Sequence, residues 1–123
     1  MRKLVFDITT NGSGAATVNA ELSVLGKLYA IEYQPGTIAT GATLTITCED
    51  GVYSKPLLTK ANAGTSNVEY YPRDLVNAVA DGSALTGTSG GDRVQPFLSG
   101  KVKVVIASGG NTLTGKVIVY YEV

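Results

Sequence analysis

The chain contains few side chains that could carry out catalysis. Among its 123 residues there is no histidine and only one cysteine, Cys48. A serine or cysteine nucleophile therefore has no imidazole base beside it, and the usual ligand set of a zinc site cannot be assembled. We expect a protein that is not an enzyme, with no catalytic residue, no cofactor and no metal ion.

Two pairs of carboxylates are the remaining candidates, because a carboxylic acid and a carboxylate together can cleave a glycosidic bond. Glu49 and Asp50 precede Gly51 at the end of an apolar segment, where acidic residues followed by glycine ordinarily form a turn. Asp74 and Asp81 fall where a helix end or a loop is expected. We interpret both pairs as structural.

The glycine-rich segment 87–91 is similar to a phosphate-binding loop, but the Lys-Ser/Thr ending and the strand-to-helix context are missing. Asp92 and Arg93 follow it directly. An Asp-Arg pair can hold a loop in place, or Arg93 can bind a partner's carboxylate through two hydrogen bonds. Loop pinning is the preferred interpretation, and contact with a partner stays open.

Tyrosines are the main candidates for recognition, because the tyrosine ring offers rigid surface that suits both protein interfaces and sugar stacking. The spacing predicts that Tyr29 and Tyr33 share a strand face, and Tyr70-Tyr71-Pro72 forms an aromatic corner. The competing role is packing, and we expect at least half of the seven tyrosines to lie in the core.

Composition limits the classes of partner. The net charge is zero, charged residues make up 16% of the chain, and no run of like charge occurs. Nucleic acid and anionic membranes both require a basic face, so we expect neither as a partner. The apolar run at the start ends at Asp7, and no stretch approaches the roughly 18 apolar residues of a membrane span. We expect a protein made in the cytoplasm.

Alternation of apolar and polar residues between turn signals is the dominant pattern and is typical of strands. It predicts strands at residues 3–10, 16–24, 27–34, 42–48, 56–60, 66–70, 101–107 and 115–122. The last two are predicted to form a hairpin across Ser108-Gly109-Gly110-Asn111. The fold class is therefore all-β, a two-sheet antiparallel β-sandwich that is jelly-roll-like, with residues 1–123 as one domain.

Two segments depart from the alternation. Residues 72–81 fit a short helix beginning at Pro72 and ending before Gly82, or an irregular loop, and both interpretations stay open. Residues 82–100 are rich in Gly, Ser and Thr and are predicted to form a long surface loop. The predicted core consists of Leu4, Phe6, Val18, Leu22, Leu44, Ile46, Val104, Ile106, Val117 and Val119.

From Lys27 onward the chain resembles small virion structural proteins of tailed bacteriophages. The resemblance is carried by KLYAIEY at 27–33, TLTIT at 43–47, YYPR at 70–73, ALTGTSGGDR at 84–93 and SGGN at 108–111. It implies a capsid cement or decoration protein, a β-sandwich or jelly roll on the head shell that clamps neighbouring capsid subunits. A head-fibre or tail component and a carbohydrate-binding β-sandwich are the alternatives.

The resemblance implies the partners and the location as well. The partners would be the major capsid protein or other virion subunits, and the protein would be found in the virion. Low charge and apolar strand faces further predict a homo-oligomer, a dimer or trimer that buries a sheet face or edge. The candidate interface residues are Tyr70, Tyr71, Arg73, Thr88, Asp92 and Arg93.

The alternation also predicts that Cys48 is buried and unreactive, because it shares a face with Leu44 and Ile46. A thiol reagent added to the native protein should label Cys48 slowly, and added urea should make labelling fast. Fast labelling of the native protein would show that this strand face is wrongly assigned.

Overall fold

β-Strands dominate the computed structural model, which describes residues 1–75 and 93–123. The described part is all-β and contains no helix. Its strands are β1 (Arg2–Thr9), β2 (Ala16–Asn19), β3 (Val24–Gln34), β4 (Thr43–Glu49), β5 (Ser54–Lys60), β6 (Val68–Tyr70), β7 (Asp74–Leu75), β8 (Arg93–Val94), β9 (Phe97–Ala107) and β10 (Thr114–Glu122).

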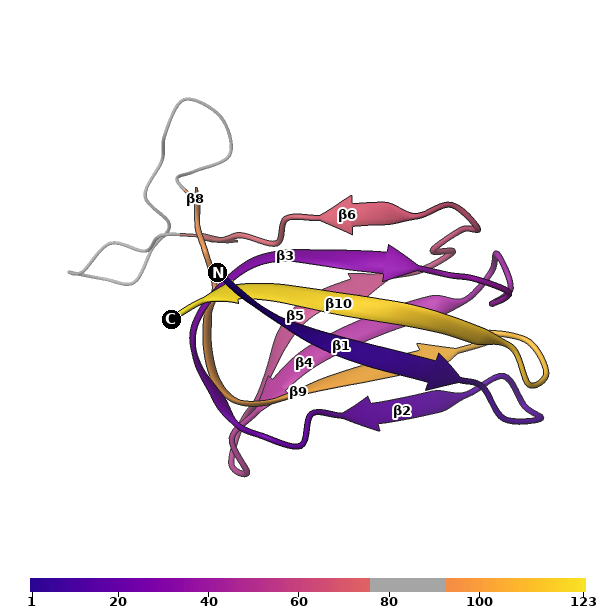
Figure 1. Ribbon diagram of the computed structural model, residues 1–123, viewed down its shortest axis with the longest axis horizontal. Coiled ribbons are helices and arrows are strands. Elements are labelled where there is room, and N and C mark those ends of the chain that lie inside the picture. Colours follow the sequence, from indigo (N-terminus) through magenta and orange to yellow (C-terminus); the bar gives the residue numbers. More distant parts are fainter. Residues whose placement is uncertain (76–92) are drawn as a thin grey trace.

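The long strands form two antiparallel layers. One has the order β1-β10-β3-β6 and the other β2-β9-β4-β5. Apart from the β4–β5 hairpin and the short β7–β8 pair, each strand along the chain lies in the layer opposite its predecessor (Figure 1). This is the eight-stranded jelly roll, with β7 and β8 between the sixth and seventh strands. The predicted all-β sandwich is confirmed.

The two layers join at one corner, where the start of β3 pairs with the start of β9. The rest of β9 pairs with β4 and β2 in the other layer. The change of layer falls at Gly100, whose φ of 125° lies in the region that favours glycine. A Cβ there would lie 2.3 Å from the backbone oxygen of Glu49, so the crossing needs a residue without a side chain.

The predicted hairpin between the last two long strands is wrong. β9 pairs with β2, β3 and β4, whereas β10 pairs with β1 and β3. The glycine-rich turn between them crosses from one layer to the other instead of reversing within a sheet. Sequential strands occupy opposite layers in a jelly roll, so a favourable turn sequence does not establish pairing.

Both layers contribute to one core. Seven of the ten predicted core residues are buried: Phe6, Leu44, Ile46, Val104, Ile106, Val117 and Val119. Leu4 and Val18 are partly buried and pack against this cluster. Leu22 is 76% exposed, which contradicts the prediction. β2 ends at Asn19, so the alternation that continues through residue 24 no longer corresponds to a strand there.

A β-bulge in β3 separates two tyrosines that were expected to share a face. Tyr120 lies opposite Ala30 and Tyr121 opposite Leu28, which leaves Tyr29 as the extra residue. Leu28 and Tyr33 both face the core as a result, while Tyr29 turns outward with 38% of its surface exposed. Only Tyr33 and Tyr121 of the seven tyrosines are buried and Tyr70 packs against the core, fewer than predicted.

Cys48 is 2% exposed on the core face of β4, as the alternation predicted. Burial raises the pKa of its thiol, which disfavours the reactive thiolate. Tyr33 is fully buried, and its hydroxyl has no hydrogen-bond partner within the described residues. Burial raises the pKa of this phenol also.

Two predictions between β6 and β9 need correction. Asp74 and Leu75 form a strand that pairs with Arg93 and Val94, so the described part of 72–81 is not helical. The predicted loop at 82–100 includes strand residues as well, because β8 and the start of β9 lie within it. Residues 76–92 lie outside the described part of the structure.

Gly100→Ala should lower the free energy of unfolding by about 2–3 kcal/mol, because the new Cβ meets the Glu49 backbone at an unfavourable φ. Chemical denaturation measures the change. Gly12→Ala is the matched control, since a Cβ there would lie 3.9 Å from Asn111 Oδ1. Equal effects of the two substitutions would contradict the role given to Gly100.

Candidate binding surface at one end of the jelly roll

The two ends of the jelly roll differ in the side chains that they expose. One end consists of the turns after β1, β3, β5 and β9, which are rich in Gly, Ser, Thr and Asn. Thr10 is buried there, donating its hydroxyl proton to the Gly110 carbonyl (2.7 Å) and accepting from the Leu113 amide (2.8 Å). None of the exposed large hydrophobic side chains of the described residues lies in these turns. We call this the polar end.

The opposite end, which we call the apolar end, exposes large hydrophobic side chains. It consists of the first half of β3, the turn between β4 and β5, the residues around β7 and β8, and the start of β9. It contributes seven of the eleven exposed large hydrophobics of the described residues: Leu25, Tyr29, Val52, Tyr53, Tyr71, Val94 and Phe97. Figure 1 shows β8 standing off this end of the sandwich.

Two tyrosines form the centre of the apolar end. The rings of Tyr29 and Tyr71 meet edge to face, with centroids 6.0 Å apart and planes at 87°. The Tyr71 hydroxyl donates to the Glu69 carboxylate at 2.7 Å. This hydrogen bond and the negative charge of Glu69 raise the pKa of Tyr71. The Tyr71 ring is therefore held in place while half of its surface remains exposed.

Arg73 fastens the segment after β6 to β3. Its Nη1 donates to the Tyr29 backbone oxygen at 3.0 Å and to the Pro72 backbone oxygen at 2.7 Å. The guanidinium thus closes the loop against the β-bulge, where the extra residue leaves a carbonyl outside the regular ladder. Arg73 therefore links the backbone of Tyr29 to the backbone next to Tyr71.

Lys55 connects three strands at the same end. Its Nζ lies 3.0 Å from Asp74 Oδ2, and 3.8 Å from the centroid of the Phe97 ring. The same amine is 3.4 Å from the Phe97 backbone oxygen. The side chain is only 16% exposed, so the amine is partly shielded from water where these attractions are stronger. Lys55 therefore ties β5, β7 and β9 together beneath an exposed aromatic ring. We refer to Tyr29, Lys55, Tyr71, Arg73 and Phe97 as the aromatic patch.

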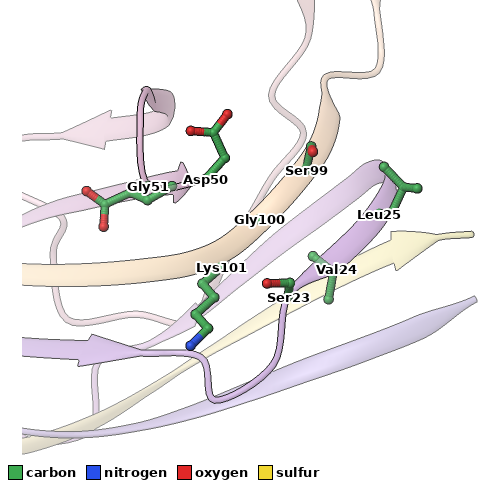
Figure 2. Close-up of a pocket in the computed structure, with 9 residues that line it drawn as sticks. Ser23, Val24, Leu25, Asp50, Gly51, Ser99, Gly100 and Lys101 are labelled. Carbon is green, nitrogen blue, oxygen red and sulfur yellow. The ribbon is translucent and has the colours of Figure 1, made fainter.

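An open groove of about 590 Å³ lies among the start of β3, the start of β9 and the turn after β4 (Figure 2). β9 forms its floor through Ser99, Gly100 and Lys101, with the start of β3 on one side and the turn after β4 on the other. The Asp50 carboxylate accepts the backbone N–H groups of Val52 and Tyr53, and these hydrogen bonds lower its pKa.

The two carboxylates of this groove have structural partners. Asp50 caps the turn as the sequence indicated, and Glu49 lies 3.9 Å from Lys103. Asp74, from the other carboxylate pair, is bound to Lys55. No cluster of His, Cys, Asp and Glu able to hold a metal ion occurs among the described residues.

The sequence-predicted interface residues fall in different places. Tyr71 is exposed at the centre of the aromatic patch, and Arg73 is half-buried beneath it. Tyr70 lies on β6 and packs against the core, and burial raises its pKa. Arg93 is exposed on β8, opposite Leu75. Thr88 and Asp92 lie outside the described residues, as does the glycine-rich segment 87–91.

Sequence reasoning missed two members of the aromatic patch, Lys55 and Phe97, and misplaced a third, Tyr29. Tyr29 had been assigned to the face of Tyr33, and no sequence signal marks the bulge that separates them. Lys55 and Phe97 lie 42 residues apart, and only the pairing of β9 with β3 and β4 brings them together. Phe97 could have been noticed as an aromatic residue directly after Pro96 in a polar stretch.

No protein-family model and no curated protein matches the chain. Among solved structures it is similar to an exo-β-1,3-galactanase from Phanerochaete chrysosporium bound to galactose, with 16% identity and a TM-score of 0.34. The match covers 97% of this chain and 27% of the galactanase chain. A likeness of this size carries no information about activity. The described residues include no helix with the length and apolarity needed to cross a membrane.

Lys55→Ala should lower the free energy of unfolding by about 1–2 kcal/mol, because it removes both the cation–π contact and the ion pair with Asp74. Lys60→Ala, at the exposed end of the same strand, should change it by less than about 0.5 kcal/mol. Urea denaturation compares the two variants. Similar values would show that Lys55 does not connect the strands energetically.

Proposed function

We propose that this protein is a non-catalytic structural component of a tailed-phage virion, a cement or decoration protein that docks on the head shell through its apolar end. The observation that carries the proposal is the unequal distribution of exposed hydrophobic side chains between the two ends. A protein that binds to the outside of a shell needs one surface that contacts the shell and another that remains exposed to water.

The composition of the aromatic patch supports docking on a protein. Tyrosine, phenylalanine and arginine are enriched in protein interfaces, and charged residues are depleted at interface centres. The rings of Tyr71 and Phe97 are exposed beside charged groups that have partners within the chain, since Glu69 accepts from Tyr71 and Lys55 pairs with Asp74. A partner can therefore cover these rings without stranding a buried charge.

A carbohydrate-binding module is the alternative function. Tyrosines lying in one plane would favour it, because a sugar ring stacks on a flat aromatic surface. Tyr29 and Tyr71 meet at 87° instead and offer no shared flat platform. Docking on a head shell, a head fibre or a tail component fits the exposed rings better.

Tyr71→Ser and Phe97→Ser should each reduce binding of the purified protein to phage heads assembled without it by about tenfold or more. The reason is loss of exposed aromatic area at the apolar end. Co-sedimentation with the heads, followed by quantification of bound protein, measures the affinity. Thr65→Ala at the polar end is the matched control and should bind like the natural sequence.

Equal binding of all these variants to phage heads would show that the apolar end is not the docking surface. Saturable binding on a glycan array, with no binding to heads, would replace the proposal by the carbohydrate alternative. Arg93→Ala distinguishes the two roles considered for Arg93. Reduced binding to phage heads with an unchanged melting temperature assigns Arg93 to the interface. A lower melting temperature with normal binding of the folded protein assigns it to holding its loop in place.

A further inference from the structure

β1 is the longest exposed sheet edge of the jelly roll that contains no proline. It spans eight residues and, among the described strands, pairs only with β10. The other edges are less suited to pairing, because β2 and β6 contain four and three residues, and Pro56 removes a backbone donor from β5. The backbone groups on the outer side of β1 are therefore available to another strand.

The side chains of β1 follow a self-complementary pattern. Phe6 and Ile8 are buried in the core, whereas Lys3, Val5 and Asp7 are exposed on the outer face. The exposed set reads cation, aliphatic, anion at equal spacing. An antiparallel copy of the same strand presents this set in reverse order, so each charge can face its opposite.

We propose that two copies of this chain pair antiparallel through β1 about a twofold axis that passes between the two Val5 residues. In this register Lys3 of each copy lies opposite Asp7 of the other, and the two Val5 side chains are adjacent. The sheet containing β1 then continues from one copy into the next. A twofold axis makes the contact self-complementary and closed, so no filament forms.

The charges select this register over its neighbours. Keeping the buried face inward permits only shifts that preserve the alternation. Moving the axis to residue 3 places Lys3 against Lys3, and moving it to residue 7 places Asp7 against Asp7. Placing it at residue 4 or 6 leaves a charge opposite Val5. Only the axis at Val5 satisfies both charges at once.

An apolar groove beside the β1 edge supports the same contact. This groove, of about 360 Å³, lies between β1 and the end of β2 with the residues that follow it. Leu4, Val18 and Leu22 supply much of its apolar lining, beside the polar side chains of Asp7, Asn19 and Glu21. Leu22 and Val5 are 76% and 48% exposed, respectively. The second copy would bring its own Leu4 to this side, covering apolar surface that the single chain leaves in water.

Charge exchange tests the register. The natural chain should sediment as a dimer at about 0.1 M salt. Lys3→Asp and Asp7→Lys should each weaken the dimer roughly tenfold or more, because like charges then face each other. An equimolar mixture of the two variants should restore dimers, since every facing pair is again opposite in charge. Lys60→Asp, on an exposed position of β5, is the control and should remain dimeric.

A covalent probe tests the position of the axis independently of charge. Val5→Cys should form a disulfide-linked dimer on oxidation, because the axis brings the two residues directly opposite. Thr9→Cys, exposed on the same strand face, should not. Native Cys48 is buried and does not compete.

A natural chain that sediments as a monomer, or a mixture that fails to restore dimers from folded variants, would overturn the proposal. Thermal melting of each variant establishes that it is folded. The Asp7 side chain is 84% exposed, and its ion pair with Lys116, at 3.5 Å, lies on the surface. Exposed ion pairs contribute little to stability, so replacing Asp7 should leave the fold intact. These readouts use the isolated protein and are independent of whether it binds phage heads.

Discussion

Burial of one face of each sheet against the other is the constraint on which the rest of this structure depends. Ile31 and Val119 from one layer share a core with Ile46 and Val104 from the other, all nearly inaccessible to water. Because most successive strands alternate between layers, the chain must pass from one layer to the other repeatedly at both ends of the sandwich. β9 must also change layer along its own length, and that bend requires Gly100.

The connections between the layers are stabilised differently at the two ends, and the difference bears on function. At the polar end short turns are closed by backbone hydrogen bonds and by buried Thr10, so small residues suffice. At the apolar end the aromatic patch closes the sandwich with an ion pair, a cation–π contact and two edge-on rings. Folding alone does not require those rings to remain half exposed, which is why we connect them with binding.

The docking end and the β1 edge are separate surfaces. The aromatic patch is built from the middle of β3, the starts of β5 and β9 and the segment 71–75, whereas the proposed twofold contact runs along β1. A dimer would therefore present two copies of the apolar end at once. Linked binding sites of modest individual affinity gain strength from simultaneous engagement, which suits attachment to a repeating shell.

Local alternation of apolar and polar residues by itself determined much about this protein. It predicted the bounds of six of the long strands to within a few residues, put Cys48 on the buried face, and indicated a sandwich. It could do so because a period of two is a property of neighbouring residues. Absence of histidine likewise restricted the available chemistry from composition alone. Strand partners, the bulge that turns Tyr29 outward, and the meeting of Lys55 with Phe97 were decided only by the tertiary structure. These features depend on contacts between residues far apart in the chain, and a turn sequence such as 108–111 is equally compatible with a hairpin and with a crossing between layers.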